Sequence, residues 1–155
     1  RELARFTFPR QTNRGTLNLA DYFASVDSGK FDVVAFQVVT VGDEADNLSD
    51  SLMHGGDYTE GYYLHGFSVE MAEAMAEYTH RHIRQELGLA DKRGLRYSWG
   101  YPAMPDVADH EKVFALLPAE AELGVSLTSA YQIVPEQSTA AMVVHHPEAI
   151  YFAAM

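Results

Sequence analysis

The sequence contains no cysteine. Disulfide bridges, thiolate zinc ligands and cysteine nucleophiles are therefore excluded, and this composition fits the reducing cytoplasm. The chain also lacks any apolar run of about 18 residues, so we expect no membrane-spanning helix. No charged and then apolar leader opens it, so we expect no signal peptide. These absences together predict a cytoplasmic protein that acts away from membranes.

Positive charge is scarce in this chain. Eleven lysine and arginine residues stand against 22 aspartates and glutamates, and the formal net charge is −11. Such a surface repels phosphate backbones, and the basic residues do not gather into a patch, so we expect no nucleic acid partner. The excess of acidic residues favours the binding of a cationic ligand or a basic partner, and it also increases solubility.

The motifs of several enzyme classes are missing. We find no GxSxG nucleophile elbow, no P-loop and no GxGxxG phosphate loop. An independent methyltransferase with a doubly wound sheet is disfavoured, because no glycine-rich loop follows the first strand. The seven histidines show no zinc spacing such as HExxH, so we expect no metal site and interpret them as surface or hydrogen-bonded side chains.

The strand signals are spread along the whole chain. At 155 residues and 47% hydrophobic content, the chain is the size of one domain with its own core. Alternating or valine-rich patterns predict strands over residues 4–8, 16–23, 31–42, 125–134, 138–145 and 150–154, with a turn over 11–15. Because 31–42 is apolar on both faces, we place it centrally in a sheet. Strands without regular helix alternation favour an α+β fold with a largely antiparallel sheet.

Helical periodicity is strongest over residues 62–87. The large apolar residues of this helix recur at three- to five-residue steps and are predicted to form its buried face: Leu64, Phe67, Met71, Met75, Tyr78, Ile83 and Leu87. Gly88 suits the cap at its end. We predict a short acidic helix over 43–54 and another that follows Asp109 as its N-cap.

Two carboxylates of the long helix are spaced for joint action. Glu73 and Glu77 are four residues apart and therefore project from one side of the helix. Glu77 is also spaced to pair with Arg81. From the pattern alone we favour a solvated stripe of ion pairs over a binding site.

The stretch "RYSWGYPAMPD", residues 96–106, is a poor helix and a poor strand, so we predict a stiff loop. Its arginine can clamp a carboxylate with two hydrogen bonds, and its aromatic faces attract sulfonium or ammonium groups. A zwitterionic ligand with an extra positive centre would suit it. A tight structural turn that buries Trp99 and Tyr101 explains the same residues, and the residues alone leave both interpretations open.

The same loop, followed by "HEKVFALL", resembles the S-adenosylmethionine-binding motif of the activation domain of cobalamin-dependent methionine synthase, with Met104 in place of the family's cysteine. Similar segments cover almost the whole chain in the right order: "FPRQ", "LNLADYF", "DVVAFQVVTVG", "YLHGFSVEMAEAMAEYTHRHIRQELG" and "PEQSTAAMVVHHPEAIYF". The resemblance implies an α+β fold with a bent, largely antiparallel sheet packed against a long helix and shorter helices. It implies that residues 1–155 are a single domain, the C-terminal part of an activation domain shortened at both ends.

The resemblance also implies a function. Methionine synthase moves a methyl group from methyltetrahydrofolate to homocysteine through cobalamin. Its activation domain binds S-adenosylmethionine and presents the methyl group to cob(II)alamin during reductive methylation, with an electron from flavodoxin or a related reductase. The implied partner is the cobalamin-binding domain, which holds the cobalamin, so the isolated domain is expected to have no turnover. The alternative is a stand-alone binding or scaffold module that kept the fold and lost the ligand.

Five residues are implied to contact S-adenosylmethionine. Arg96 matches the motif arginine that holds the ligand carboxylate, and Glu73 aligns with a helix glutamate near the ligand amine. Ser98 matches a position whose backbone contacts the ligand. Tyr151 and Phe152 align with two adjacent aromatics near the ligand.

Three residues of the loop are implied to face cobalamin. Tyr101 matches the motif tyrosine that faces the corrin when the activation domain docks. Gly100 and Pro102 keep the loop of that tyrosine tight.

Overall fold

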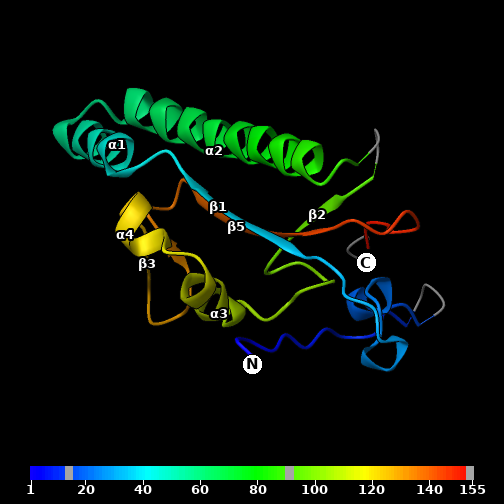
Figure 1. Ribbon diagram of the computed structural model, residues 1–155. Coiled ribbons are helices and arrows are strands. Elements are labelled where there is room, and N and C mark those ends of the chain that lie inside the picture. The colour runs from blue at the N-terminus through cyan, green and yellow to red at the C-terminus, as the bar shows by residue number, and fades with distance from the viewer. Residues whose placement is uncertain (13–15, 90–92, 153–155) are drawn as a thin grey trace.

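A computed structural model describes residues 1–12, 16–89 and 93–152 and has helices on both sides of a small sheet (Figure 1). Helices α1 and α2 cover one side, and α3, α4 and the N-terminal segment lie on the other. The α+β fold with an antiparallel sheet, one long helix and shorter helices is confirmed. The elements in chain order are η1 (Leu19–Tyr22), η2 (Val26–Ser28), β1 (Ala35–Thr40), α1 (Asp43–Gly55), α2 (Tyr58–Glu86), β2 (Leu95–Ser98), α3 (Asp109–Leu116), α4 (Ala119–Leu123), β3 (Ser126–Leu127), β4 (Ile133–Val134) and β5 (Ser138–Val144).

The main sheet has three antiparallel strands in the order β1-β5-β2. The strand predicted over 138–145 is confirmed as β5, and it is the central one. The prediction that 31–42 lies centrally is wrong, because β1 covers only Ala35–Thr40 and forms an edge. Residues of β1 are apolar on both faces because α2 covers one face and the core covers the other, and this burial needs no second neighbouring strand.

Both strands predicted near the N-terminus are wrong. Residues 4–8 form no strand, although their aromatic rings pack on the core. Within 16–23 the chain forms the 3-10 helix η1. The Asn18 side chain accepts a hydrogen bond from the Ala20 amide (2.7 Å), and the Asp21 carboxylate accepts one from the Asn18 amide (3.0 Å). This local capping box satisfies backbone groups that a strand would have paired with a neighbour.

The predicted C-terminal strands also differ from the structure. The segment 125–134 is a short antiparallel hairpin of β3 and β4 rather than one strand. Its turn is closed by a hydrogen bond from the Thr128 amide to the Gln132 carbonyl (2.9 Å). Residues 150–152 form no strand, so that prediction is wrong for them, and 153–154 lie outside the described residues, as do 13–15 of the predicted turn.

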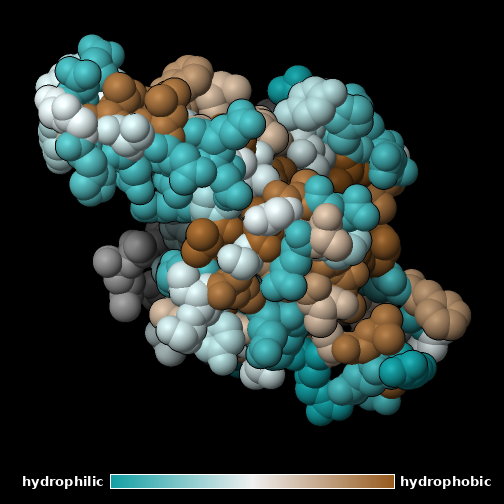
Figure 2. Space-filling model, turned by 90° about the vertical axis from the view of Figure 1, so that its left-hand side faces the viewer, coloured by the Kyte–Doolittle hydropathy of each residue, from teal (hydrophilic) through white to brown (hydrophobic). Residues whose placement is uncertain are grey.

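The long helix is confirmed as α2, which begins at Tyr58 and ends at Glu86, with Gly88 in the left-handed conformation after it. Its predicted buried face is wrong for four of the seven residues, whereas Leu64, Ile83 and Leu87 are half-buried. The buried residues are mostly small and share another face: Gly61, Ser68, Ala72, Ala76 and His80. Phe67, Met71, Met75 and Tyr78 are exposed. Figure 2, with the helical layer at the top, shows hydrophobic side chains (brown) on its surface among hydrophilic ones.

Close packing explains why α2 buries small residues. The Gln37 side-chain amide on β1 donates to the Ala76 carbonyl (3.1 Å), which requires the strand and the helix backbone to approach closely. At the other end of α2, Ser49 of α1 donates to the Gly61 carbonyl (2.9 Å). A Cβ atom on Gly61 would lie 2.7 Å from the Ser49 carbonyl oxygen, so only glycine fits there.

The shorter helices follow local signals in part. The acidic helix predicted over 43–54 is confirmed as α1. The helix predicted near Asp109 is confirmed as α3, but the prediction that Asp109 is its N-cap is wrong. Asp109 is the first helical residue and pairs with Lys112 (2.5 Å), while the carboxylate of Asp106 accepts the Ala108 amide (3.0 Å). No described helix is long and apolar enough to cross a membrane.

The hydrophobic core lies on the face of the sheet opposite α2. Its buried residues come from η1, β2, the loop after β2, α3 and β5: Leu19, Tyr22, Tyr97, Trp99, Ala103, Met104, Val113, Ala140, Met142 and Val144. Phe6, Phe8, Phe36 and Val38 pack against it. The alternation of β2 and β5 thus sends one set of side chains into this core and leaves the other set facing α2.

One carboxylate joins three distant parts of the chain. Asp32 accepts hydrogen bonds from the Ala24 and Val33 amides (2.7 and 2.8 Å) and lies 2.5 Å from the His145 ring. The hydrogen bond from Ala24, followed by those from His145 and Val33, lowers the pKa of Asp32 despite its partial burial. The ionised form of Asp32 therefore stabilises the fold.

We expect Ala76→Leu to lower the free energy of unfolding by about 1–3 kcal/mol, because the larger side chain has no space between α2 and β1. Urea denaturation of the parent and the variant measures this. Ala74→Leu is the matched control, since Ala74 is exposed on the same helix and should change stability by less than about 0.5 kcal/mol. Equal effects of the two substitutions would contradict the close packing.

We expect Asp32→Asn to lower the free energy of unfolding at pH 7. A carboxylate whose folded pKa is depressed contributes stability above its unfolded pKa of about 3.9 and loses it as the pH falls through the folded pKa. The difference between parent and variant should therefore shrink below about pH 4. Urea denaturation at pH 7 and about pH 3 tests this, with the exposed Asp27→Asn as control. A difference that stays constant with pH would contradict it.

Candidate ligand-binding groove

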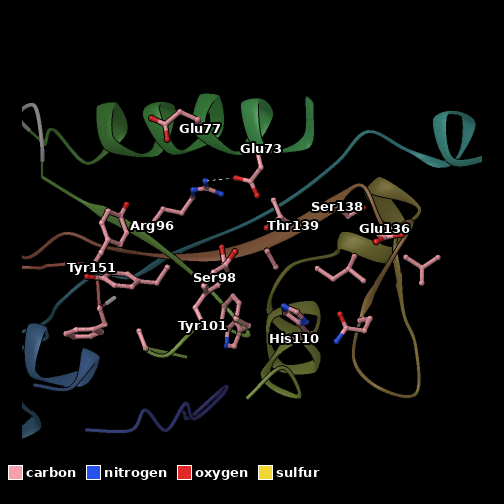
Figure 3. A pocket seen from close by; sticks show the side chains of 18 of the residues that line it. Glu73, Glu77, Arg96, Ser98, Tyr101, His110, Glu136, Ser138, Thr139 and Tyr151 are labelled. Atoms are coloured by element: carbon pink, nitrogen blue, oxygen red, sulfur yellow. Dashed lines mark hydrogen bonds and ion pairs between the residues drawn. The ribbon is translucent and has the colours of Figure 1, made fainter. Parts of the chain in front are cut away.

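A groove of about 770 Å³ lies beside the sheet, with residues of α2 on one side and of α3 on the other (Figure 3). Its walls come from α1, α2, β2, the following loop, α3, strands β4 and β5 with the segment between them, and the C-terminal segment. Its lining residues are Asp46, Glu73, Glu77, Arg96, Tyr97, Ser98, Trp99, Tyr101, Ala103, His110, Gln132, Ile133, Val134, Glu136, Ser138, Thr139, Ala140, Tyr151 and Phe152. All five residues predicted to contact S-adenosylmethionine, and Tyr101 as well, are among them.

The first residues of the predicted loop form a strand instead. Leu95–Ser98 is β2, which pairs with β5 so that Arg96 lies opposite Val143 and Tyr97 opposite Met142. Because side chains alternate along a strand, Arg96 and Ser98 share the face toward α2, while Tyr97 points into the core. The prediction of a loop over 96–98 is wrong, since neighbours distant in sequence supply its hydrogen bonds.

Two of the predicted residues meet across the groove. The guanidinium of Arg96 on β2 donates to the carboxylate of Glu73 on α2 at 3.0 Å (Figure 3). The Arg96 side chain is largely buried, and that of Glu73 is exposed. The solvated stripe of ion pairs favoured by the helical pattern is therefore wrong for Glu73, whose partner is 23 residues away.

The turn after β2 separates two aromatic residues. The Gly100 amide donates to the Met104 carbonyl, and the Met104 amide donates to the Tyr101 carbonyl, both at 2.8 Å. Gly100 has a φ of +87°, which favours glycine. Trp99 is 5% exposed and belongs to the core, whereas Tyr101 is 66% exposed. The structural interpretation thus holds for Trp99, and the prediction that the turn buries Tyr101 is wrong.

The other two residues predicted to face cobalamin support the turn. Gly100 and Pro102 flank Tyr101 but are not among the groove-lining residues. The Pro102 carbonyl accepts a hydrogen bond from the Gln11 side chain (2.9 Å), which ties the turn to the N-terminal segment. Tyr101 is therefore the residue of this turn whose side chain is exposed and also lines the groove.

Tyr97, which the sequence analysis missed, anchors the aromatic end of the groove. Its hydroxyl donates to the Ile150 carbonyl (2.6 Å), and its ring lies 5.5 Å from that of Tyr151 and 6.4 Å from that of Phe152. Burial, followed by the nearby Tyr22 and Tyr151, raises the pKa of Tyr97 well above its usual range, so the hydroxyl stays a donor. A tyrosine in the core is an ordinary packing residue, so its spacing carried no functional signal.

Two further groove residues had weak sequence signals. Glu77, which the spacing paired with Arg81, has its Oε2 atom 3.5 Å from Nδ1 of His80. The buried His80 is hydrogen-bonded to the Gly94 carbonyl (2.6 Å), as the interpretation of the histidines predicted. His110 of α3 lines the groove, with its ring 5.5 Å from that of Trp99, and the sequence analysis assigned it no role.

Negative charge dominates the groove. Among the described residues that line it, the four carboxylates of Asp46, Glu73, Glu77 and Glu136 stand against the one guanidinium of Arg96. Among the residues that the structure describes, no group of three or more metal-ligating side chains could hold a metal ion. The groove can therefore bind a carboxylate at one point and otherwise favours positive charge.

Comparisons with known proteins agree with this architecture. The chain matches the profile of the family described as vitamin B12 dependent methionine synthase, activation domain, over residues 2–155. Methionine synthase of Mycobacterium tuberculosis is 39% identical over 171 residues, and the match covers 96% of this chain and 14% of that protein. Methionine synthase of Mycobacterium leprae is 37% identical with the same coverage. The chain thus spans about one seventh of the length of these curated relatives.

A solved structure has the same fold. The crystal structure of the MetH reactivation domain bound to AdoHcy matches with a TM-score of 0.83 and 29% sequence identity. The match covers 92% of this chain and 48% of that chain. The family profile, the relatives and the fold agree. The chain belongs to the family of activation domains of vitamin B12 dependent methionine synthase.

Proposed function

We propose that this chain binds S-adenosylmethionine in the groove under α2 and presents its methyl group to the cobalamin of a methionine synthase during reductive methylation. The ligand would be held for methyl donation, and the chain by itself would have no turnover, because the methyl acceptor belongs to another domain. The proposal rests on family membership, on the AdoHcy bound to the similar reactivation domain, and on the groove described above.

The observation that carries the proposal is the pairing of Arg96 and Glu73 across the groove. The amino acid part of S-adenosylmethionine bears a carboxylate and an ammonium group, and this pair offers one charge complementary to each. The guanidinium can accept a carboxylate with two parallel hydrogen bonds. Because the two side chains come from β2 and α2, they fix the direction in which the ligand lies.

The rest of the groove suits a cationic sulfonium compound. Tyr101 and Tyr151 are 66% and 57% exposed and stand on its walls, where their faces can contact a sulfonium. The excess of carboxylates adds attraction for positive charge.

We also propose that Tyr101 lies on the surface that contacts the cobalamin of the partner domain. Its exposed ring at the tip of a tight turn suits contact with a flat macrocycle. Cobalamin, which the cobalamin-binding domain would hold, would supply the metal that accepts the methyl group, and flavodoxin or a related reductase would supply the electron. The role of this chain is to bind the ligand and to hold its methyl group in the orientation for transfer. This is catalysis by proximity.

We expect Arg96→Ala to weaken S-adenosylmethionine binding by about 10- to 100-fold, since a hydrogen bond to a charged group contributes about 1.5–3 kcal/mol. Isothermal titration calorimetry of the parent and the variant measures this. Arg81→Ala is the matched control, because Arg81 is exposed on α2 and does not line the groove.

Two results would contradict the proposal. If the parent shows no saturable binding of S-adenosylmethionine, the chain is better described as a scaffold module that lacks the ligand. If Arg96→Ala and Arg81→Ala weaken binding equally while both variants keep the parent's thermal unfolding, the carboxylate of the ligand does not lie at Arg96.

We expect Tyr97→Phe to weaken the same binding by several-fold, because loss of the bond to the Ile150 carbonyl releases the segment that carries Tyr151 and Phe152. Hydrogen exchange of residues 150–152 should rise in the variant, and calorimetry measures the affinity. Tyr78→Phe, at an exposed position of α2, is the control. Faster exchange without any loss of affinity would mean that the aromatic pair does not touch the ligand.

A further inference from the structure

Glu77 carries a charge in the groove with which no lysine or arginine side chain forms an ion pair in the part of the chain that the structure describes. It lies one helical turn after Glu73 on α2, on the same side of the groove as Arg96 and Tyr151 in Figure 3. Arg96 pairs with Glu73 at 3.0 Å. The polar contact that the structure gives Glu77 is with His80, at 3.5 Å.

The orientation of His80 makes it a poor partner for this carboxylate. Nε2 of His80 lies 2.6 Å from the Gly94 carbonyl oxygen, and a carbonyl only accepts, so Nε2 carries the hydrogen. In the neutral ring Nδ1 is then an acceptor and cannot donate to Glu77. With His80 neutral, the negative charge of Glu77 is available to the groove.

The other carboxylates of the groove are engaged or distant. Glu73 pairs with Arg96, and Asp46 accepts a hydrogen bond from the Gln137 side chain (3.0 Å). Glu136 lies at the opposite end from Glu77 (Figure 3). Glu77 is thus the carboxylate without a strong partner at the end of the groove that carries Arg96 and Tyr151. The proposed function places the amino acid part of the ligand, and the sulfur beside it, at this end.

The chemistry of methyl donation changes the charge at that sulfur. When the methyl group leaves the sulfonium, the carbon–sulfur bond breaks, its electron pair stays on sulfur, and the methyl group bonds to the acceptor. S-adenosylmethionine thereby loses one positive charge and becomes the neutral thioether S-adenosylhomocysteine. Every other group of the ligand is unchanged, so a difference in binding between the two compounds reports on charge and on the methyl group.

We propose that Glu77 determines specificity at this site by making the groove prefer the sulfonium over the thioether. Methyl transfer then weakens the binding of the ligand, because the product S-adenosylhomocysteine is neutral at sulfur. The weaker binding favours release of the product. This inference rests on the proposed function of the groove. It deepens that function by assigning to one residue the discrimination between the ligand before and after reaction.

The expected size of the effect follows from the exposure of Glu77. Its side chain is 55% exposed, so solvent screens its field, and exposed charge pairs contribute modestly. We therefore expect Glu77→Gln to reduce the ratio of the two dissociation constants, thioether over sulfonium, by about two- to fivefold. Most of the change should come from weaker binding of S-adenosylmethionine.

The test is calorimetric titration of both compounds into the parent, Glu77→Gln, Glu77→Asp and Glu60→Gln. Glu60 is the matched control, because it is exposed on α2 and does not line the groove. The ratio should fall in Glu77→Gln, recover at least in part in Glu77→Asp, and stay at the parent value in Glu60→Gln. In the parent it should also fall when ionic strength rises from about 0.05 to about 0.5 M.

The failures of the two proposals are distinguishable. If the parent binds neither compound, the proposed function fails and this inference fails with it. If the parent binds both compounds but Glu77→Gln leaves their ratio unchanged, or Glu60→Gln changes it equally, only the role of Glu77 is overturned.

Discussion

The close contact between α2 and β1 is the constraint on which the rest of this structure depends. Ala72 and Ala76 bring the helix so near to the sheet that Gln37 reaches the Ala76 carbonyl. With larger residues on this face, the helix would stand farther from the sheet. The same approach brings Glu73, one turn before the contact on the neighbouring side of the helix, within hydrogen-bond distance of Arg96.

The central position of β5 supplies the second half of the site. It pairs with β1 on one side and β2 on the other, so that the three strands present one common face to α2. Arg96 and Ser98 stand on that face because the register of β2 places them opposite Val143 and Ala141. The other face of the same strands forms the core with Tyr97 and Trp99. The face toward α2 thus carries the Arg96–Glu73 pair, while four residues of the core, Tyr97, Trp99, Ala103 and Ala140, also line the groove.

The charge of the groove connects this architecture to the proposed ligand. A guanidinium in a groove lined mostly by carboxylates can orient a zwitterion while the remaining field favours an additional positive centre. The acidic composition of the whole chain points in the same direction, but only the arrangement shows which carboxylates already have partners. The hydrogen bond of His80 to the Gly94 carbonyl separates Glu77 from the others in this respect.

Sequence patterns located the strongest elements and residues that the structure brings together in one groove. The periodicities of β1, β5, α1 and α2 were sufficient to place those elements, because each depends on residues close in the chain. The motif resemblance selected five residues that line one groove, including Tyr151, which is 55 positions from Arg96. The strands predicted over 4–8 and 16–23 failed because aromatic and alternating residues also suit loops that pack on a core.

The sequence by itself determined the fold class, the long helix, the family and the residues expected to bind a ligand. Only the tertiary structure decided that α2 buries alanines instead of its large apolar side chains, that β2 is a strand, and that Glu73 faces Arg96. Local periodicity records which side chains share a face, but not which face meets a neighbour. That choice depends on how closely two backbones can approach, and this is set jointly by segments far apart in the chain.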